Sequence, residues 1–403
     1  MTTVWKTKAL GDVCRFIDYR GKTPEKTADG IRLITAKNVK MGFLQMKPLE
    51  FVSRSIYDSW MTRGIPKKGD VLFTTEAPLA NIAQLDTDES VVFAQRIIIL
   101  QPVEPSLDCT FLKYLLLSEV VQQRIHAKGT GATVKGIKAS ILKTVEIVFP
   151  PLPEQHRIVA ILDEAFDGIA TAKANAEKNL QNARALFESH VQTVFSQRGD
   201  GWEEAKLSDL CFIKHGFAFK SEFFAAEGDF VLLTPGNFYE SGGYRDRGEK
   251  QKYYVGEIPR DYVLNEGDLL VAMTEQAAGL LGSSILVPET GKFLHNQRLG
   301  LVTKKDDAPW INEFFFHVFN TQSVRKEIHA SASGVKVRHT SPSKIGEVVV
   351  GFPTSMDEQR SIVSTLVELN EEIQRFESIY QEKIALLDEL KKSLLHQAFS
   401  GNL

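Results

Sequence analysis

The sequence has 403 residues, of which 43% are hydrophobic and 25% charged, and its formal net charge is −3. No apolar run approaches the 18 residues of a membrane-spanning helix, and residues 1–10 lack the charged-then-apolar layout of a signal peptide, so we expect a cytoplasmic protein without membrane contact. Three scattered cysteines exclude a disulfide framework and a cysteine metal site, and we expect small buried side chains.

The charge is unevenly distributed along the chain. Residues 1–153 carry 21 Lys and Arg against 15 Asp and Glu, whereas residues 202–353 carry 17 against 20. A nucleic-acid-binding protein usually has a basic footprint. The first segment can have one overall, but the second can have one only if its basic residues gather on one face. Net charge alone therefore does not indicate the partner.

Residues 1–153 alternate short apolar stretches with turns that Gly and Pro mark. Residues 91–93, 97–100 and 145–149 are rich in Val, Ile and Phe and predict strands. Leucine, valine and isoleucine at helical spacing predict one helix over residues 109–126. We therefore expect a compact α+β domain.

A long helix is predicted next, from residue 154 to about 198. This stretch contains no proline and one glycine, Gly168. Apolar spacing of three and four over about six heptads is typical of a coiled coil, and about 43 residues span roughly 65 Å. The alternative is an amphipathic helix that lies along its own domain. The apolar positions are Ile158, Ile161, Leu162, Ala165, Ile169, Ala172, Ala176, Leu180, Ala183, Phe187, Val191 and Val194.

The second half of the chain repeats the first. Trp5 and Cys14 return as Trp202 and Cys211, and the offset grows from 197 to 204 along the chain. The repeat predicts strands over 285–287 and 348–350, a helix over 311–329, and a second long helix. That helix has apolar positions at Ile362, Leu366, Leu369, Ile373, Phe376, Tyr380, Ile384, Leu387, Leu390 and Leu394.

The predicted architecture is α+β, with two tandem recognition domains that are each followed by a long helix. The predicted boundaries are 1–153 for the first domain, 154–199 for the first helix, 200–353 for the second domain and 354–403 for the second helix. If the helices pair as an antiparallel coiled coil, the two domains lie at opposite ends of the pair. Duplex DNA has a similar approximate two-fold symmetry, so it is the natural partner.

The motifs of several enzyme classes are missing from the sequence. It has no Asn/Asp-Pro-Pro-aromatic motif of amino-methyltransferases, no His-Glu-x-x-His and no Cys-x-x-Cys. Residues 131–138 superficially resemble a phosphate-binding loop but lack its Gly-Lys-Ser/Thr ending. We therefore expect no catalytic site, cofactor or metal in this chain.

Several segments, duplicated in order before the two long helices, resemble the DNA-specificity subunit of type I restriction-modification systems over nearly the whole length. In the first half they are residues 69–78 (GDVLFTTEAP), 93–96 (FAQR), 131–137 (GATVKGI) and 149–155 (FPPLPEQ). In the second half they are residues 267–270 (GDLL), 295–298 (HNQR), 334–342 (GVKVRHTSP) and 357–360 (DEQR). The proline-rich entry to the first helix is replaced by residues 354–356 (TSM) in the second.

The resemblance implies a non-catalytic subunit whose two target recognition domains each read half of a bipartite, asymmetric DNA sequence. It also implies that the helices act as a spacer and as a docking site for two adenine-N6 methyltransferase subunits, which hold S-adenosylmethionine. A separate ATP-driven restriction subunit would translocate and cut the DNA. Two alternatives remain: an enzyme with an unrecognised site, and a coiled-coil scaffold that binds only proteins.

Base and phosphate contacts require particular side chains. Arg and Lys read guanine, Asn and Gln read adenine, and Lys, Thr and Ser hold phosphates. Gln95, Arg96 and Arg298 lie in a Gln-Arg pair that both repeats share, so they can equally brace a loop, and Thr74 and Thr75 can simply end a strand. The candidates are Arg20, Lys22, Lys37, Asn38, Thr74, Thr75, Gln95, Arg96, Thr133, Lys135 and Lys138, and then Lys214, His215, Lys220, Asn237, Tyr244, Arg245, Thr274, Gln276, Asn296, Arg298, Lys336, Arg338 and His339.

Overall fold

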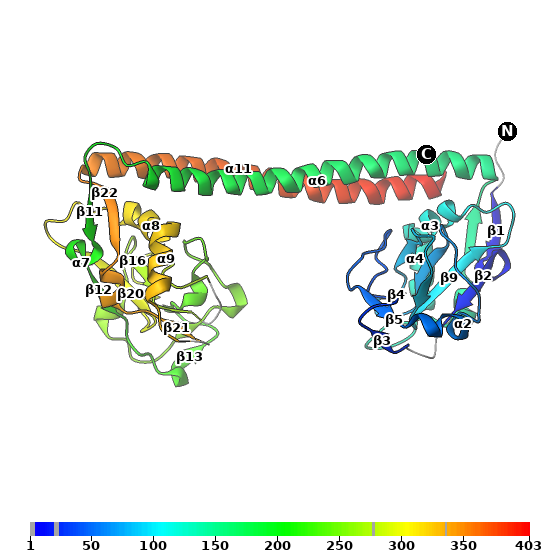
Figure 1. Cartoon of the computed structure of the whole chain (residues 1–403), viewed down its shortest axis with the longest axis horizontal. Coiled ribbons are helices and arrows are strands. Elements are labelled where there is room, and N and C mark those ends of the chain that lie inside the picture. The colour runs from blue at the N-terminus through cyan, green and yellow to red at the C-terminus, as the bar shows by residue number, and fades with distance from the viewer. Residues whose placement is uncertain (1–4, 20–23, 276–278, 335–336) are drawn as a thin grey trace. The chain divides into compact units, whose positions relative to one another are not determined.

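The computed structural model describes residues 5–19, 24–275, 279–334 and 337–403. They divide into two compact units, residues 1–178 with 380–403, and residues 179–379. Each unit holds one α+β domain, the start of the long helix that follows it and the end of the other long helix (Figure 1). We call the domains of these units domain 1 and domain 2.

A four-stranded antiparallel sheet forms the middle layer of domain 1. Residues of β9 alternate between two cores: Ile98 and Leu100 pack towards helices, and Ile97 and Ile99 towards a second sheet. An uninterrupted apolar run is expected of a strand that is buried on both faces. The strand order is β2 (Cys14–Asp18), β9 (Ile97–Pro102), β6 (Val71–Thr74) and β7 (Ile82–Gln84).

The two faces of this sheet are covered by different elements. One face packs against the sheet β3 (Lys26–Thr27), β5 (Glu50–Val52), β4 (Ile31–Ile34) and β8 (Val91–Phe93). The other packs against α3 (Cys109–Leu117), α4 (Glu119–Lys128) and the long helices. The remaining elements are β1 (Lys6–Ala9), its partner β10 (Glu146–Phe149), α1 (Leu10–Val13), α2 (Tyr57–Trp60), α5 (Ala139–Leu142) and the 3-10 turn Arg54–Ile56.

Domain 2 repeats the two four-stranded sheets in the same strand order. Its middle sheet is β12 (Cys211–His215), β20 (Leu299–Lys304), β16 (Leu269–Ala272) and β18 (Ser284–Leu286). Its outer sheet is β13 (Phe224–Ala225), β15 (Tyr253–Tyr254), β14 (Val231–Leu232) and β19 (Phe293–Leu294). The other strands and α-helices are β11 (Trp202–Lys206) with β22 (Val349–Pro353), β17 (Thr274–Glu275) with β21 (Arg338–His339), α7 (Leu207–Leu210), α8 (Asn312–Asn320), α9 (Gln322–Ser331) and α10 (Pro342–Gly346). The 3-10 turns are Ser221–Phe223, Pro235–Asn237, Gly248–Lys250 and Arg260–Tyr262.

The single helix predicted in each domain is wrong, because the structure has two helices there. The break falls at Ser118 and Thr321, whose backbones are extended. Each hydroxyl donates to a preceding carbonyl, that of Leu115 at 2.6 Å and that of Val318 at 2.7 Å. Ser and Thr compete with the helical backbone in this way, while the apolar spacing continues unchanged on both sides.

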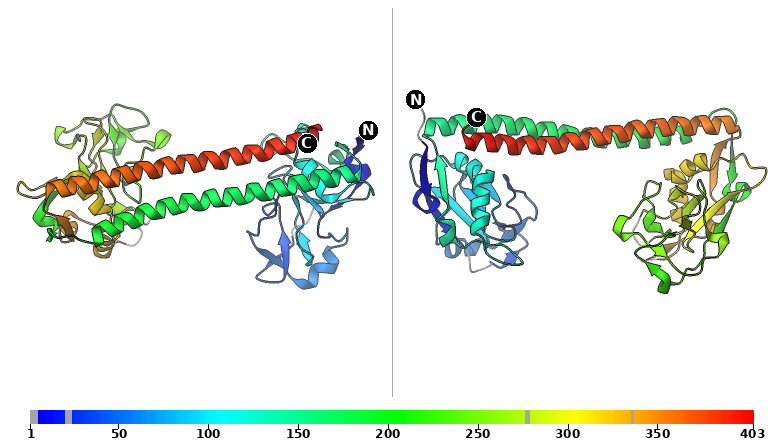
Figure 2. Two further views of the ribbon diagram at one scale, coloured as in Figure 1. Left: turned by 90° about the horizontal axis from the view of Figure 1, so that it is seen from above. Right: turned by 180° about the vertical axis from the view of Figure 1, so that it is seen from behind.

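The long helices are α6 (Leu152–Ser196) and α11 (Met356–Ser400), each 45 residues long. Within each unit their segments lie side by side and antiparallel, as predicted (Figure 2). Lys173 Nζ lies 2.7 Å from the Asp388 carboxylate in one unit, and Arg184 pairs with Glu377 in the other.

One part of the predicted stripe on α11 is wrong. Phe376 and Leu390 are exposed, and the neighbouring Glu377 and Lys391 are partly buried in their places. Glu377 receives its ion pair from α6, and Lys391 Nζ lies 4.9 Å from the centre of the Phe166 ring. Long charged side chains can cover apolar surface in this way.

A buried glutamine joins each long helix to the domain before it. Gln155 Oε1 accepts from the Asp108 N–H at 2.9 Å, and its Nε2 donates to the carbonyls of Ser106 and Pro150. Gln359 makes the same three bonds, to the N–H of Ile311 and the carbonyls of Pro309 and Pro353. Both side chains are fully buried, so each helix start is fixed to its domain.

An aromatic residue joins the end of each long helix to a domain. The Phe399 ring of α11 packs edge-on against Phe111 of domain 1, with 5.4 Å between the ring centres. The Phe195 ring of α6 packs against Phe314 of domain 2 at the same distance. Equivalent residues of the two repeats therefore make equivalent contacts, and each domain needs parts of both helices.

The prediction that the cysteines are buried is confirmed for two of the three. Burial raises the pKa of Cys14 and of Cys211 to about 12, and Cys109 is partly exposed. Among the described residues, no helix is both long and apolar enough to cross a membrane.

We expect Gln155→Leu to lower the free energy of unfolding by about 2–4 kcal/mol, because it leaves one N–H and two carbonyls buried without partners. Gln123→Leu is the matched control, since Gln123 is exposed and its amide donates to Glu119 on its own helix. Urea titration of the two variants measures the difference. Equal midpoints would show that the buried glutamine does not hold the helix.

We expect His295→Phe to make unfolding less dependent on pH. Burial lowers the pKa of His295 to about 4, so the unfolded chain takes up a proton near pH 6.5 that the folded chain refuses. The stabilisation that comes from the neutral His295 ring is therefore complete above pH 6.5, and it is lost as the pH falls towards 4. Phe93 fills the equivalent place in domain 1. Urea midpoints at pH 7 and pH 4.5 should differ less in the variant than in the parent, and an equal difference would contradict the assignment.

Candidate nucleic-acid interface

Three loops of domain 1 form one continuous surface. We call them loop A (residues 37–48), loop B (75–81) and loop C (129–137). Asn81 Nδ2 of loop B donates to the Val39 carbonyl of loop A at 2.9 Å. The Thr75 carbonyl of loop B accepts from the Ile137 N–H of loop C at 2.9 Å. Loop B therefore connects the other two.

Domain 2 builds the same surface from loops A′ (residues 236–247), B′ (273–283) and C′ (332–340). Residues 276–278 and 335–336 lie outside the described residues. Ser283 Oγ donates to the Tyr239 carbonyl at 2.7 Å, which joins B′ to A′. The Thr340 N–H donates to the Met273 carbonyl at 3.0 Å, which joins C′ to B′. The two repeats share this frame although the tips of their loops differ in sequence.

One asparagine at the base of loop A, and one at the base of A′, is structural. Asn38 Oδ1 accepts from the N–H and the hydroxyl of Thr35, and its Nδ2 donates to the carbonyls of Gln45 and Pro48. Asn237 makes equivalent bonds with Thr234 in domain 2. Both amides are buried, so these two candidates cannot reach a base and are corrected to loop supports.

Three other candidates are also buried. Thr74 ends β6, and its hydroxyl donates to the Pro78 carbonyl at 2.7 Å. Thr75 is buried and holds loops through its backbone, and Asn296 Oδ1 accepts from the Arg298 N–H at 3.0 Å. The alternative interpretation, that Thr74 and Thr75 finish a strand, is therefore the one that fits the structure.

Loops C and C′ depend on a glycine. Gly131 has φ +122° and Gly334 has φ +99°, and a Cβ on either would lie 2.1 Å from a carbonyl oxygen, that of Val134 or Val337. Only glycine tolerates such backbone angles without strain. Both loops therefore require a glycine at the equivalent place, and Thr133 and Lys135 are exposed at the tip of loop C.

Loops B and C of domain 1 line a hollow of about 370 Å³ with the turn that carries Gln95 and Arg96. Arg96 has φ +80°, and its Nε lies 2.9 Å from Glu76 Oε1. Both side chains are 45% exposed, so this pair is weak and Arg96 can exchange the carboxylate for a phosphate. Lys138 also lines the hollow.

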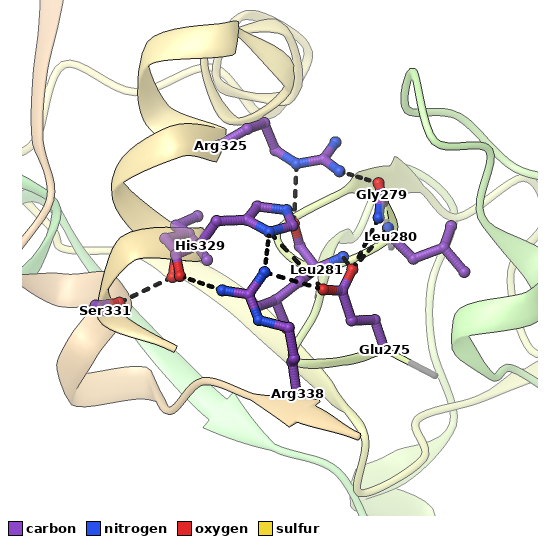
Figure 3. A network of polar contacts seen from close by, with 9 residues as sticks. Glu275, Gly279, Leu280, Leu281, Arg325, His329, Ser331 and Arg338 are labelled. Carbon is purple, nitrogen blue, oxygen red and sulfur yellow. Dashed lines mark hydrogen bonds and ion pairs between the residues drawn. The ribbon is translucent and has the colours of Figure 1, made fainter. Parts of the chain in front are cut away.

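Loop B′ is held differently, through a buried carboxylate (Figure 3). Glu275 Oε2 accepts from the backbone N–H groups of Gly279, Leu280 and Leu281, at 2.9–3.1 Å. Arg325 donates to the carbonyls of Leu281 and Gly279 from the other side. The backbone on either side of residues 276–278 is therefore fixed.

The same carboxylate orients a candidate residue. Arg338 Nη1 lies 3.6 Å from Glu275 Oε1 and 3.1 Å from His329 Nδ1 (Figure 3). Burial lowers the pKa of His329 and outweighs the opposite effect of the Glu275 carboxylate. The ring is therefore neutral at pH 7, and its Nδ1 can accept from Arg338. Sequence reasoning missed Glu275. A Thr-Glu pair at residues 75–76 and 274–275, within the offset range of the repeats, could have identified it.

The remaining candidates fall into three groups. Arg20, Lys22, Gln276 and Lys336 lie outside the described residues. Lys214, His215 and Lys220 are exposed on or after β12, outside the three loops, and Lys214 Nζ lies 4.5 Å from the centre of the Tyr262 ring. The others lie in the loops or beside them, with Tyr244 and Thr274 partly buried and with Lys37, Arg245, Arg298 and His339 exposed.

A family model described as the type I restriction modification DNA specificity domain matches this chain twice, at residues 3–181 and 199–382. The chain belongs to this family. It is 26% identical over 223 residues to the specificity subunit of the type I restriction enzyme EcoBI of Escherichia coli, which covers 55% of this chain and 43% of that protein. It is 19% identical over 415 residues to the MjaVIII specificity subunit of Methanocaldococcus jannaschii, which covers 99% and 93%.

Solved structures show the same fold. A chain from a structural study of complex assembly and conformational transition of the type I R-M system aligns over 100% of both chains, with a TM-score of 0.76 and 18% identity. The HsdS subunit of Thermoanaerobacter tengcongensis aligns over 99% of this chain and 97% of its own, with a TM-score of 0.60 and 18% identity. The predicted α+β architecture of two tandem specificity domains with long helices is therefore confirmed.

Gly131→Ala should weaken sequence-specific DNA binding at least tenfold, on the order of the strain that a Cβ at positive φ introduces. Gly168→Ala is the control, because Gly168 lies on α6 with nothing within 4 Å of its Cβ position and should gain about 0.5–1 kcal/mol of stability. Gel-shift titration of the chain with its partner subunits on duplex DNA measures the affinity. If Gly131→Ala binds as tightly as the control, loop C is not part of the interface.

Proposed function

We propose that this chain is a non-catalytic, sequence-specific subunit that reads a bipartite, asymmetric duplex DNA target, one half with each domain. The observation that carries the proposal is the shared frame of loops A–C and A′–C′ beneath tips of different sequence. Similar frames direct the loops of both domains to the DNA, and tips of different sequence select different bases. Protein contacts to base edges specify sequence, whereas phosphate contacts position the protein.

The two long helices then set the distance between the half-sites. Each helix start is fixed by a buried glutamine, and each helix end packs on a domain through Phe195 or Phe399. A domain attached at both points cannot move independently of the helix segments of its unit. The length of the helices therefore determines the length of the DNA segment between the two half-sites, which neither domain reads and which we call the gap.

The proposed partners are two adenine-N6 methyltransferase subunits, which hold S-adenosylmethionine, and ATP-dependent restriction subunits. Helix α11 leaves Phe376 and Ile379 exposed in the unit of domain 2, and Leu386 and Leu390 exposed in the unit of domain 1. Spacings of three and four place each pair on one side of its helix segment. Exposed apolar side chains of this kind are typical of a docking surface. We propose that they receive the methyltransferase subunits, in the cytoplasm, where the DNA is accessible.

Lengthening the helices should change the gap. Residues 176 and 385 face each other by the register of Lys173 with Asp388. Four residues inserted after Ala176 and four after Ala385 lengthen the pair by about 6 Å, roughly two base pairs. The methylated motif should have a longer gap, or methylation should be lost. A four-residue insertion after Asp88, in an exposed loop, should leave the motif unchanged. Full activity on the original motif with the helix insertion would refute the proposed spacer.

Exchanging one domain should change one half of the target. Residues 1–153 replaced by the equivalent domain of another specificity subunit should give a methylated motif with one new half and one original half, read by methylation mapping. A change in both halves would show that the domains do not read independently.

A further inference from the structure

The tip of loop A carries large apolar side chains that are exposed to solvent. Met41, Phe43, Met46 and the adjoining Leu49 are 46–58% exposed. Residues 37–49 also contain three lysines and no acidic residue. Single exposed apolar residues are normal on a protein surface, but a cluster of this kind marks a binding site.

The tip cannot fold its apolar side chains away, because the loop is held from beneath. Beyond the four bonds of Asn38, Gln45 Nε2 donates to the Lys37 carbonyl at 3.0 Å. The Lys40 N–H donates to the Phe43 carbonyl at 3.0 Å, and the Gly42 N–H donates to the Ile82 carbonyl at 2.7 Å. A loop that is already ordered loses little conformational entropy on binding.

We propose that loop A inserts Phe43, with Met41 and Met46 beside it, between neighbouring base pairs of the duplex at the half-site of domain 1. The proposal rests on the proposed function and adds how that domain reads its half-site. Apolar wedges of Phe, Leu or Met partly unstack a base step and kink the duplex, and nearby basic residues hold the phosphates. Lys37, Lys40 and Lys47 supply these charges.

Charge and position favour DNA over a protein as the occupant. The three lysines around the tip can pair with phosphates, and the apolar side chains of the tip can contact the faces of stacked bases. Loop A is continuous, through Asn81 of loop B, with the hollow that Arg96 and Lys138 line. A wedge at this place therefore enters the same duplex that the rest of the surface faces.

Loop A′ of domain 2 has no equivalent tip. Its one large exposed apolar side chain is Tyr239, with the Arg245 guanidinium 5.9 Å from the ring centre, and Glu240 and Asp246 make the loop partly acidic. Unstacking should therefore occur in only one half of the target.

The test uses the assembled methyltransferase with the full-length chain and a duplex that contains its methylated motif. 2-aminopurine replaces one adenine at a time, except the two target adenines, because methyltransferases flip their target base out of the stack. The parent should raise the fluorescence at one step of one half-site. Phe43→Ala should abolish this rise and weaken binding by on the order of tenfold, while the sequence preference remains. Val103→Ala removes an equally exposed side chain of the same domain outside loop A and should change neither.

Each other outcome is decisive. If the Phe43→Ala variant gives the same fluorescence rise as the parent, the wedge is overturned. If the rise is the same and the variant also assembles less well with the methyltransferase subunits, the tip is a protein-docking site instead. If Phe43→Ala abolishes all binding, Phe43→Leu should restore binding and fluorescence together, and its failure overturns the wedge. Absence of selective binding by the parent would refute the proposed function itself.

Discussion

One buried glutamine at the start of each long helix determines how that helix leaves its domain. An amide that is fully enclosed must pair both its oxygen and its nitrogen, because an unpaired buried polar group costs about 1–3 kcal/mol. Gln155 and Gln359 satisfy this requirement with the same three backbone partners in the two repeats. The geometry is therefore defined by hydrogen bonds and not only by apolar packing, which tolerates sliding. Every use of the helices as a spacer depends on this joint.

The duplication explains why each compact unit combines both halves of the chain. The end of α11 packs on domain 1 through Phe399, and the end of α6 packs on domain 2 through Phe195. The same division of roles recurs in the loops. Buried residues such as Asn38 and Asn237 build a similar frame in the two repeats, and the exposed tips above them differ in sequence. A frame that is shared between the repeats can hold loop tips of different sequence without any change in the rest of the fold.

Much of the architecture could be predicted from the sequence because it depends on repetition and periodicity. The twofold repeat, the long helices and the double-faced strands all leave regular patterns. The helix breaks at Ser118 and Thr321 leave no such pattern, because a hydroxyl that bonds the backbone does not disturb the apolar spacing. The exposed Phe376 was missed because Glu377 takes the contact position through an ion pair. Candidate contacts chosen by residue type included Asn38, whose chemistry suits adenine equally well but whose amide is used to brace a loop.

Methylation mapping of DNA from the host cell, with the gene for this chain intact and then deleted, tests the central claim most directly. The partner subunits must remain expressed in both strains. We predict that deletion removes one N6-methyladenine motif made of two different short blocks separated by a fixed gap. The same methylation pattern in both strains would contradict the assignment of this chain as the subunit that selects the target.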